Sequence, residues 1–341
     1  MPQAPKNVPT WTITIADAAV GEDASGLLPR ALRCEIGMDG VGRCAIDLIV
    51  PDGASLPEPG APLVVALGFD GSNKPAFSGE IDGVRATVSG VTVTAGDALA
   101  RLANSFGAGN FIDRTAGAIV RDALDIAGAT AGTLDDGPTL GQYVLYPGLS
   151  LLHHLRVLAE QVGAVLFADA DGKVHFILAT AGKSHSFSLR GDVLAVDLRR
   201  TPTARSGVEV WGEGASASRG ASKSHWLPAD LAGIKAVART SGTAVYHSSS
   251  DACTVLVRDG AVRTGDAATE VAKGRAAALE RPLWGSLEVA GAPTVAPNDL
   301  VSLTDFSLGH LEDLVGAAAL RVRRVRHRLD LERGFTTRME F

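Results

Sequence analysis

The sequence has few cysteines and no long apolar run. Its three cysteines, Cys34, Cys44 and Cys253, include no CxxC pair, so neither a disulfide framework nor a zinc site is expected, and a reducing compartment fits. No segment approaches the ~20 apolar residues of a membrane-spanning helix. Residues 1–11 also lack the apolar stretch of a signal peptide. We therefore expect a soluble protein, made in the cytoplasm and without a membrane anchor.

Excess positive charge and aromatic residues are also lacking. The net charge is −6, the pI is about 5.8, and aromatic residues make up 5% of the chain. Proteins that grip nucleic acid usually carry a basic surface, so direct nucleic-acid recognition is not expected as the main function. Carbohydrate- or host-recognition modules usually cluster Trp and Tyr, and here four Trp and three Tyr are scattered.

What the chain does have is length and apolar content. With 341 residues, 46% apolar residues and a mean hydropathy of +0.16, it can bury two or three cores. The 39 glycines favour many turns and short strands. We expect a mainly β protein with an α+β insertion, divided into residues 1–105, 106–200 and 201–341.

Residues 1–105 are expected to form the first β-barrel module. "TWTITIAD" alternates apolar Trp11, Ile13 and Ile15 with polar residues, which is typical of a half-buried strand. "LRCEIGMDGVGRCAIDLIV" predicts a hairpin that turns at residues 39–40, and "PLVVALGF" predicts a more fully buried strand. "FSGEIDGVRATVSGVTVTAGD" predicts two further strands separated at residues 89–90.

Residues 106–200 are expected to form a small α+β module. "TAGAIVRDALDIAG" predicts a helix between a Thr115 cap and Gly128. A second helix is predicted between Ser150 and Gly163, followed by two strands that turn across residues 169–172. Its apolar stripe comprises Leu151, Leu152, Leu155, Leu158, Ala159 and Val162.

Residues 201–341 are expected to form a second β-barrel module. It contains a strand in "GVEVWG", a Gly/Ser-rich loop at 212–224 and a short helix that stops at Pro282. Strands then follow in "GSLEVAG", "NDLVSLTDF" and "AALRVRRVRHRLDLERGFTTRMEF".

The two β regions resemble each other in order and spacing. Each has an apolar strand, a loop, and then two strands that turn through a glycine, Gly90 or Gly334. We align Ile81, Val84 and Val88 with Val322, Val325 and Leu329, and attribute the three-then-four spacing to a strand with one bulge. A chain with two like modules can form a ring with twice its own rotational symmetry.

The residues that could carry chemistry are better explained without it. His153 and His154 are adjacent, not spaced for two ligands on one helix face, and we expect both on a solvated or interface face. Asp169 and Asp171 begin like a calcium loop but lack its closing Glu, so we predict a hairpin turn. The acidic pairs 135–136 and 312–313 are expected in solvated loops. No catalytic, cofactor-binding or metal-binding residue is predicted, and the protein is not expected to be an enzyme.

The basic run "RVRRVRHR" at 321–328 lacks the aromatic residues that stack on single-stranded nucleic acid. We interpret it as an edge or lumen-facing strand that forms ion pairs between chains.

Four stretches together resemble the central baseplate hub of contractile tails, the phage late control protein D family, and the hub portion of type VI secretion valine-glycine-repeat spikes. They are "FSGEIDGVRATVSGVTVTAGD", "YVLYPGLSLLHHLRVLAEQVGAVLFADADGKVHF", "GSLEVAGAPTVAPNDLVSL" and "LRVRRVRHRLDLERGFTTRMEF". The resemblance reaches from about Trp11 to Phe341 and is one of pattern, without invariant signature residues.

The resemblance implies two tail-tube-like barrels in each chain of a homotrimer. Their pseudo-sixfold ring would adapt a hexameric tail tube to a trimeric spike, with the α+β module at the periphery. Implied partners are the spike, tube and baseplate wedge proteins, within a phage virion, a tailocin or another extracellular injection particle. The sequence ends at Phe341 without the OB-fold and needle of type VI spikes, so a separate spike protein is expected. Two alternatives remain: a cell-wall-degrading tail enzyme and a host-recognition β-rich binding module.

Overall fold

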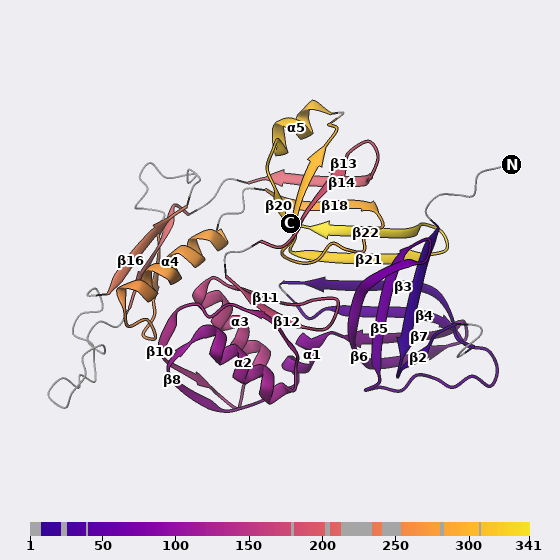
Figure 1. Ribbon diagram of the computed structural model, residues 1–341, viewed down its shortest axis with the longest axis horizontal. Coiled ribbons are helices and arrows are strands. Elements are labelled where there is room, and N and C mark those ends of the chain that lie inside the picture. The colour runs from indigo at the N-terminus through magenta and orange to yellow at the C-terminus, as the bar shows by residue number, and fades with distance from the viewer. Residues whose placement is uncertain are drawn as a thin grey trace.

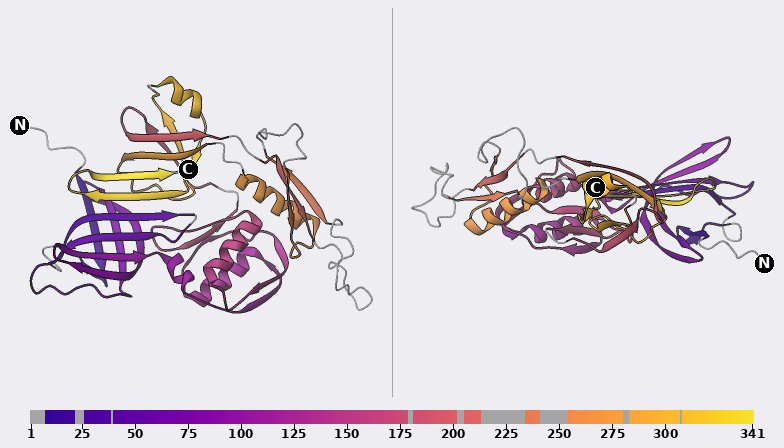
Figure 2. Two further views of the ribbon diagram at one scale, coloured as in Figure 1. Left: turned by 180° about the vertical axis from the view of Figure 1, so that it is seen from behind. Right: turned by 90° about the horizontal axis from the view of Figure 1, so that it is seen from above.

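The computed structural model describes residues 8–21, 26–38, 40–178, 181–201, 205–212, 234–240, 254–279, 283–306 and 308–341. The protein is mainly β, as predicted, and seen from above it is long and flat (Figure 2). A large sheet occupies one end and the helical regions the other (Figure 1).

One antiparallel sheet passes through both β regions. Strands β18, β22, β21, β3 and β4 lie one below the other in Figure 1, and β5 and β6 stand across them at one side. In spatial order the sheet consists of β14 (Val193–Arg200), β18 (Leu283–Ala290), β22 (Gly334–Glu340), β21 (Arg324–Asp330), β3 (Leu28–Gly37), β4 (Arg43–Ile49), β7 (Gly90–Gly96), β6 (Ser72–Thr87), β5 (Pro62–Phe69), β1 (Pro9–Ile15) and β2 (Ala18–Ala19).

The strand alternation places apolar residues on one face of this sheet. Ile13 and Ile15 of β1 are buried as predicted, and so are Leu63, Val65 and Leu67 of β5. As expected, β5 is more fully buried than β1, but only one of its faces is buried, because Val64 is 45% exposed. A curled antiparallel sheet packs one face inward and leaves the other to solvent.

The same strand order occurs twice within the sheet. The N-terminal copy is β3-β4-β7-β6, and the C-terminal copy is β14-β18-β22-β21. In the first copy Gly96 pairs with Arg43 and Glu80, while in the second Glu340 pairs with Ser286 and Arg324. The two ends of the chain thus repeat one pattern of antiparallel pairing.

The residue alignment expected from the sequence is shifted. Ile81 pairs with Ala95 and Val325 with Met339, so strand register matches Ile81 with Val325, not with Val322. The bulge lies only in β6, where Asp82 is the extra residue between two paired positions. Val88 follows β6 in its turn and is fully exposed, so it does not face inward.

The expected boundary at residue 200 differs from the strand pairing. β13 (Ser184–Ser188) pairs with β19 (Leu300–Thr304), and β14 pairs with β18, so both extend the C-terminal β region. β20 (Leu320–Arg321) also pairs with β19, and α5 (Gly309–Val315) lies between them in the chain.

A separate core forms between β7 and β13. The helices α2 (Ala116–Ala127) and α3 (Leu151–Val162) begin and end at the predicted caps, Thr115 and Gly128 for α2, Ser150 and Gly163 for α3. The whole predicted apolar stripe of α3 is buried. The remaining elements are α1 (Ala98–Ala103), β8 (Gly109–Thr115), β9 (Ala131–Leu134), β10 (Thr139–Leu145), β11 (Val165–Ala168) and β12 (Val174–Ile177).

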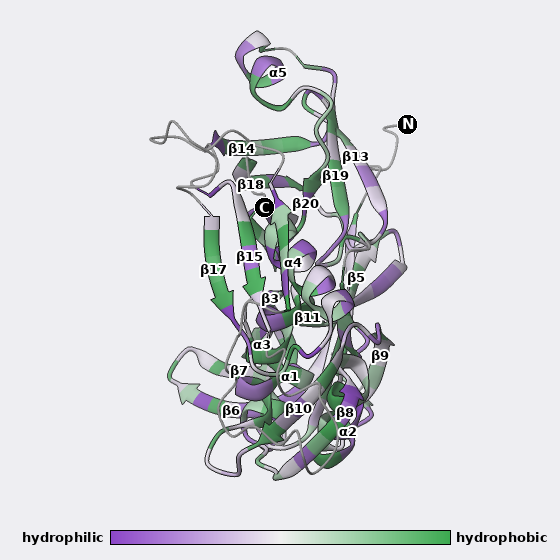
Figure 3. Ribbon diagram, turned by 90° about the vertical axis from the view of Figure 1, so that its left-hand side faces the viewer, coloured by the Kyte–Doolittle hydropathy of each residue, from purple (hydrophilic) through white to green (hydrophobic). Residues whose placement is uncertain are grey.

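A further small core was not expected within 201–341. Strands β15 (Gly207–Trp211), β16 (Lys235–Arg239) and β17 (Thr254–Arg258) form a sheet that α4 (Gly265–Leu279) covers. Hydrophobic residues recur along β15 and β17 (Figure 3), and Val210 and Val271 are fully buried. Nearly all of the Gly/Ser-rich loop at 212–224, beyond Gly212, lies outside the described residues.

Candidate assembly interface

The two copies of the repeat meet where β21 pairs with β3. Seven consecutive residue pairs join them, from Arg324 with Gly37 to Asp330 with Ala31. On the apolar face Val325 lies opposite Ile36, and both are buried. The two modules therefore share one hydrophobic core and one unbroken sheet.

The polar face of this junction carries ion pairs. The Arg326 Nε donates to Glu35 Oε2 at 2.8 Å, and a terminal guanidinium nitrogen of Arg326 lies 2.7 Å from the same oxygen. Arg324 lies 3.4 Å from the other Glu35 oxygen and 3.5 Å from Glu340. The basic run is thus an interior strand whose arginines pair within the chain. The expectation of an edge strand is therefore wrong for residues 324–328, whereas a lumen-facing strand and ion pairs between chains stay predictions.

A buried histidine marks the apolar side of the junction. His327 lies opposite Cys34 in the strand register, and its Nδ1 is 3.0 Å from Thr337 Oγ1. Burial lowers the pKa of His327 to about 4, so the ring is neutral at pH 7. Among the described residues, its Nε2 has no hydrogen-bond partner.

Cys34 and Cys44 face each other across the β3–β4 hairpin. Their Sγ atoms are 3.2 Å apart, both side chains are buried, and both are free thiols. Burial raises the pKa of Cys34 well above its usual value. The sequence interval of ten residues did not reveal this proximity, because only the hairpin register sets it. Cys253 lies outside the described residues.

In the described part of the chain, the outer edge of the C-terminal copy and part of the outer edge of the N-terminal copy lack a strand partner. Within the parts of the chain that the structure describes, β14 pairs only with β18. The first half of β6 pairs with β5, whereas its last residues, 83–87, pair only with β7. Unpaired N–H and C=O groups along an edge are a template for pairing with another chain.

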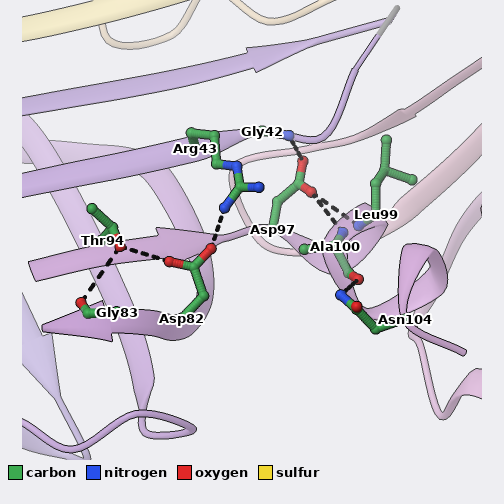
Figure 4. A network of polar contacts seen from close by, with 9 residues as sticks. All are labelled: Gly42, Arg43, Asp82, Gly83, Thr94, Asp97, Leu99, Ala100 and Asn104. Carbon is green, nitrogen blue, oxygen red and sulfur yellow. Dashed lines mark hydrogen bonds and ion pairs between the residues drawn. The ribbon is translucent and has the colours of Figure 1, made fainter.

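A polar network ties the N-terminal sheet to the α+β core (Figure 4). Asp97 is the N-cap of α1 and accepts from the backbone N–H groups of Gly42, Leu99 and Ala100 at 2.8, 3.0 and 3.3 Å. It is 3% exposed, and burial raises its pKa to about 6 against the opposing effect of these donors.

Beside this network lies a pocket between β6 and α1, lined by residues that include Arg43, Asp82, Arg101 and Glu80. Its charges are paired, Arg43 with Asp82 and Arg101 with Glu80. The opposite charges in these two ion pairs balance each other, and Asp97 also lines the pocket. The network fixes where the α+β region leaves the sheet.

The adjacent histidines on α3 have different surroundings. His153 is exposed, but His154 is buried, and its Nε2 accepts from the Tyr146 backbone N–H at 3.0 Å. The expectation that both face solvent or an interface is thus wrong for His154. A buried polar group needs a hydrogen-bond partner, and the backbone provides it.

The acidic candidates have structural roles or none. Asp169 Oδ1 accepts from the backbone N–H of Asp171 and of Lys173, as expected for a hairpin turn, and its other oxygen lies 2.9 Å from His175 Nε2. Asp135 Oδ2 accepts from Leu178 N. Residues 312–313 lie in α5, not in a loop.

The described ranges hold neither a metal-binding cluster nor a membrane-spanning helix. No three His, Cys, Asp or Glu side chains there are grouped to hold a metal ion. Nor is any described helix long and apolar enough to cross a membrane.

No protein-family model and no curated protein sequence matches this chain. Solved structures do. The 43 kDa tail protein of prophage MuSo2 from Shewanella oneidensis superposes with a TM-score of 0.66 and 16% identity, covering 97% of each chain. A tail protein from Neisseria meningitidis MC58 gives 0.67 and 14%, covering 98% of this chain and 96% of the other.

A third similar structure comes from a secretion machine. It is an Escherichia coli component of the type VI secretion system, described as structurally similar to the T4 bacteriophage tail proteins gp27 and gp5. It gives a TM-score of 0.58 and 13% identity, and covers 92% of this chain and 73% of that one. The particular late control protein D family stays a prediction. The chain has the fold shared by these phage tail proteins and the type VI secretion component.

Proposed function

We propose that this chain is a structural hub of the baseplate in a contractile tail or injection particle. In this proposal a homotrimer forms a pseudo-sixfold ring between a hexameric tail tube and a trimeric spike, with wedge proteins around it. The proposal assigns no catalytic step. The observation that carries it is the β21–β3 junction, where two copies of one strand pattern already join edge to edge.

Ring closure repeats that junction between chains. By the strand order, β6 corresponds to β21 and β14 corresponds to β3. The unpaired part of β6 in one chain would therefore pair antiparallel with β14 of the next. Three chains with two repeats each then give six repeats and leave these edges covered.

The internal register gives the register between chains. Arg328 lies opposite Arg33 at the internal junction. Matching strand positions through β7 and β22 assigns Arg85 to Arg328, and matching through β4 and β18 assigns Ala195 to Arg33. Arg85 of one chain is therefore expected opposite Ala195 of its neighbour, and both positions are exposed in the single chain.

This register can be tested by disulfide cross-linking. Directly opposed residues in antiparallel strands lie roughly 4.5–5.5 Å apart at Cα, within disulfide range. The variant Arg85→Cys with Ala195→Cys should form covalent trimers on mild oxidation, and each single variant should not. The matched control pairs Arg85→Cys with Ile112→Cys, since Ile112 is 62% exposed on β8 of the α+β region.

The cross-linking and the oligomeric state distinguish a trimeric ring from a monomer and from random collision. Covalent trimers that disappear with a reductant support the ring. A monodisperse monomer in the presence of both spike and tube proteins would overturn the proposed function. Cross-linking equally efficient in the control pair would show random collision and would refute the register.

A further inference from the structure

In each copy of the repeat, the last two strands are joined by a hairpin turn with an exposed apolar residue at the same place. The turn from β6 to β7 begins with Val88, and the turn from β21 to β22 begins with Leu331. Thr87 pairs with Gly90 before the first turn, and Asp330 pairs with Gly334 before the second. The relative exposures of Val88 and Leu331 are 109% and 89%.

Side-chain hydrogen bonds hold both turns. Thr87 Oγ1 donates to the Gly90 carbonyl at 3.0 Å and lies 3.1 Å from Ser89 Oγ. Asp330 Oδ1 accepts from the backbone N–H groups of Glu332 and Arg333 at 2.9 and 2.7 Å. Hairpin turns are normally polar, so a held turn that presents Val or Leu to water is unusual.

Both turns lie on the same rim of the sheet, which we call the turn rim. β21 pairs antiparallel with β3, and β3, β4, β7 and β6 each pair antiparallel with the next strand in this order. The strand direction therefore reverses four times between β21 and β6. β21 and β6 therefore point the same way, and the turns that follow them meet the same side. On the opposite rim β7 leads into α1, and β22 leads to Phe341.

An apolar groove adjoins the Leu331 turn. Its lining includes Trp11, Leu32, Leu329 and Leu331, together with Pro9 and Pro29. One side of it is the β3–β21 junction, because Leu32 pairs with Leu329 there. If β14 of a neighbouring chain pairs with β6, the Val88 turn gains a strand in the same relative position.

We infer that the turn rim is the surface that docks the hexameric tail tube. This inference rests on the proposed function. A trimer would present three Val88 and three Leu331 tips in alternation around one rim, six nearly equivalent apolar points. A sixfold partner with one apolar socket per subunit matches that number, whereas each subunit of a threefold spike would have to meet two such points. The tube therefore fits the turn rim, and the spike the rim that holds the C-terminus.

The test uses the trimer and the tube protein of the same particle. Val88→Asp and Leu331→Asp are made singly and together, because a buried carboxylate without a partner is strongly disfavoured. The Val88→Asp/Leu331→Asp trimer should bind tube hexamers at least about tenfold more weakly, with each single variant intermediate. Ile112→Asp is the matched control, since it adds the same charge at an exposed apolar residue of the α+β region.

Trimer mass and tube binding are measured separately, by light scattering and by cosedimentation. A variant trimer that binds the tube like the unaltered protein overturns the docking surface and leaves the hub intact. Equal loss in Ile112→Asp also overturns it. If the unaltered chain forms no trimer, the hub proposal itself fails. If the double variant alone fails to form trimers, Val88→Ser and Leu331→Ser replace it, and unchanged tube binding by those trimers overturns the inference.

Discussion

Arg326 and Glu35 lie 291 positions apart in the chain, yet their side chains meet at 2.7 Å across the middle of one sheet. Both side chains are about three-quarters buried. Because β21 and β3 belong to different copies of the repeat, this contact holds the first and last parts of the chain together. It also shows within a single chain how one copy can join the next.

Removing the Glu35 charge should weaken this junction. Glu35→Gln takes away the shared partner of Arg324 and Arg326, and we expect the free energy of unfolding to fall by about 1 kcal/mol. Arg33→Gln is the control, because Arg33 is 58% exposed and 3.9 Å from Glu35. It should cost less than about 0.5 kcal/mol. Urea unfolding measures the loss of stability in both variants. Equal losses would contradict the role of Glu35 in holding the β21–β3 junction.

Asp97 should make acidification stabilising over a limited range. Its pKa of about 6 lies above the usual 3.8, so the folded state binds more protons than the unfolded state between these values. The free energy of unfolding should therefore rise as pH falls from about 6 toward 4, by up to about 3 kcal/mol from this group. In Asp97→Asn this contribution should vanish, so the variant should lose more stability on acidification than the unaltered protein does. An unchanged pH slope in the variant would show that Asp97 does not titrate in this range.

His327 should act in the opposite direction. Its pKa of about 4 lies below the usual 6.5, so the unfolded state binds more protons between these values. Stability present above pH 6.5 is lost as pH falls toward 4, by up to about 3 kcal/mol from this group. His327→Leu with Thr337→Val removes both hydrogen-bonding partners, and its stability should lose this acid sensitivity. Unfolding curves between pH 4 and 7.5 test this, and an acid sensitivity equal to that of the unaltered protein would refute it.

Local features were predictable because they depend on near neighbours. Residues around Ser150 and Gly163 specify the ends of α3 through capping and a left-handed C-cap. The alternation in β1 and the turn at 169–172 follow from the same short-range rules, and the turn expected at 89–90 lies one residue earlier, at 88–89. The repeat was visible in the sequence, but its register was off by three residues before Asp82 and by two after it; the bulge at Asp82, which has no counterpart in β21, accounts for the difference of one residue.

The candidate interface could be predicted only in part. After β6 and after β21 the sequence has an apolar residue, then polar residues, then a glycine, in "TVSG" and "DLERG". This order would have indicated that Val88 and Leu331 lie at the tips of the turns. Glu35 alternates with buried Cys34 and Ile36, which marks a polar-face position, but no sequence signal names its partner. Likewise His154 sits on a helix face that looked polar, and only the nearby Tyr146 backbone made burial possible.

The sequence by itself determined the mainly β class, the limits of α2 and α3, and the presence of two similar β regions, since periodicity and capping are local properties. Only the tertiary structure decided that β21 joins β3, that β13 and β14 belong to the C-terminal β region, and that Arg324, Arg326 and Arg328 lie on an interior strand. Strand neighbours are chosen by long-range backbone hydrogen bonding and by the shared core beneath. A strand's own sequence specifies which face is buried, but not which strand lies beside it.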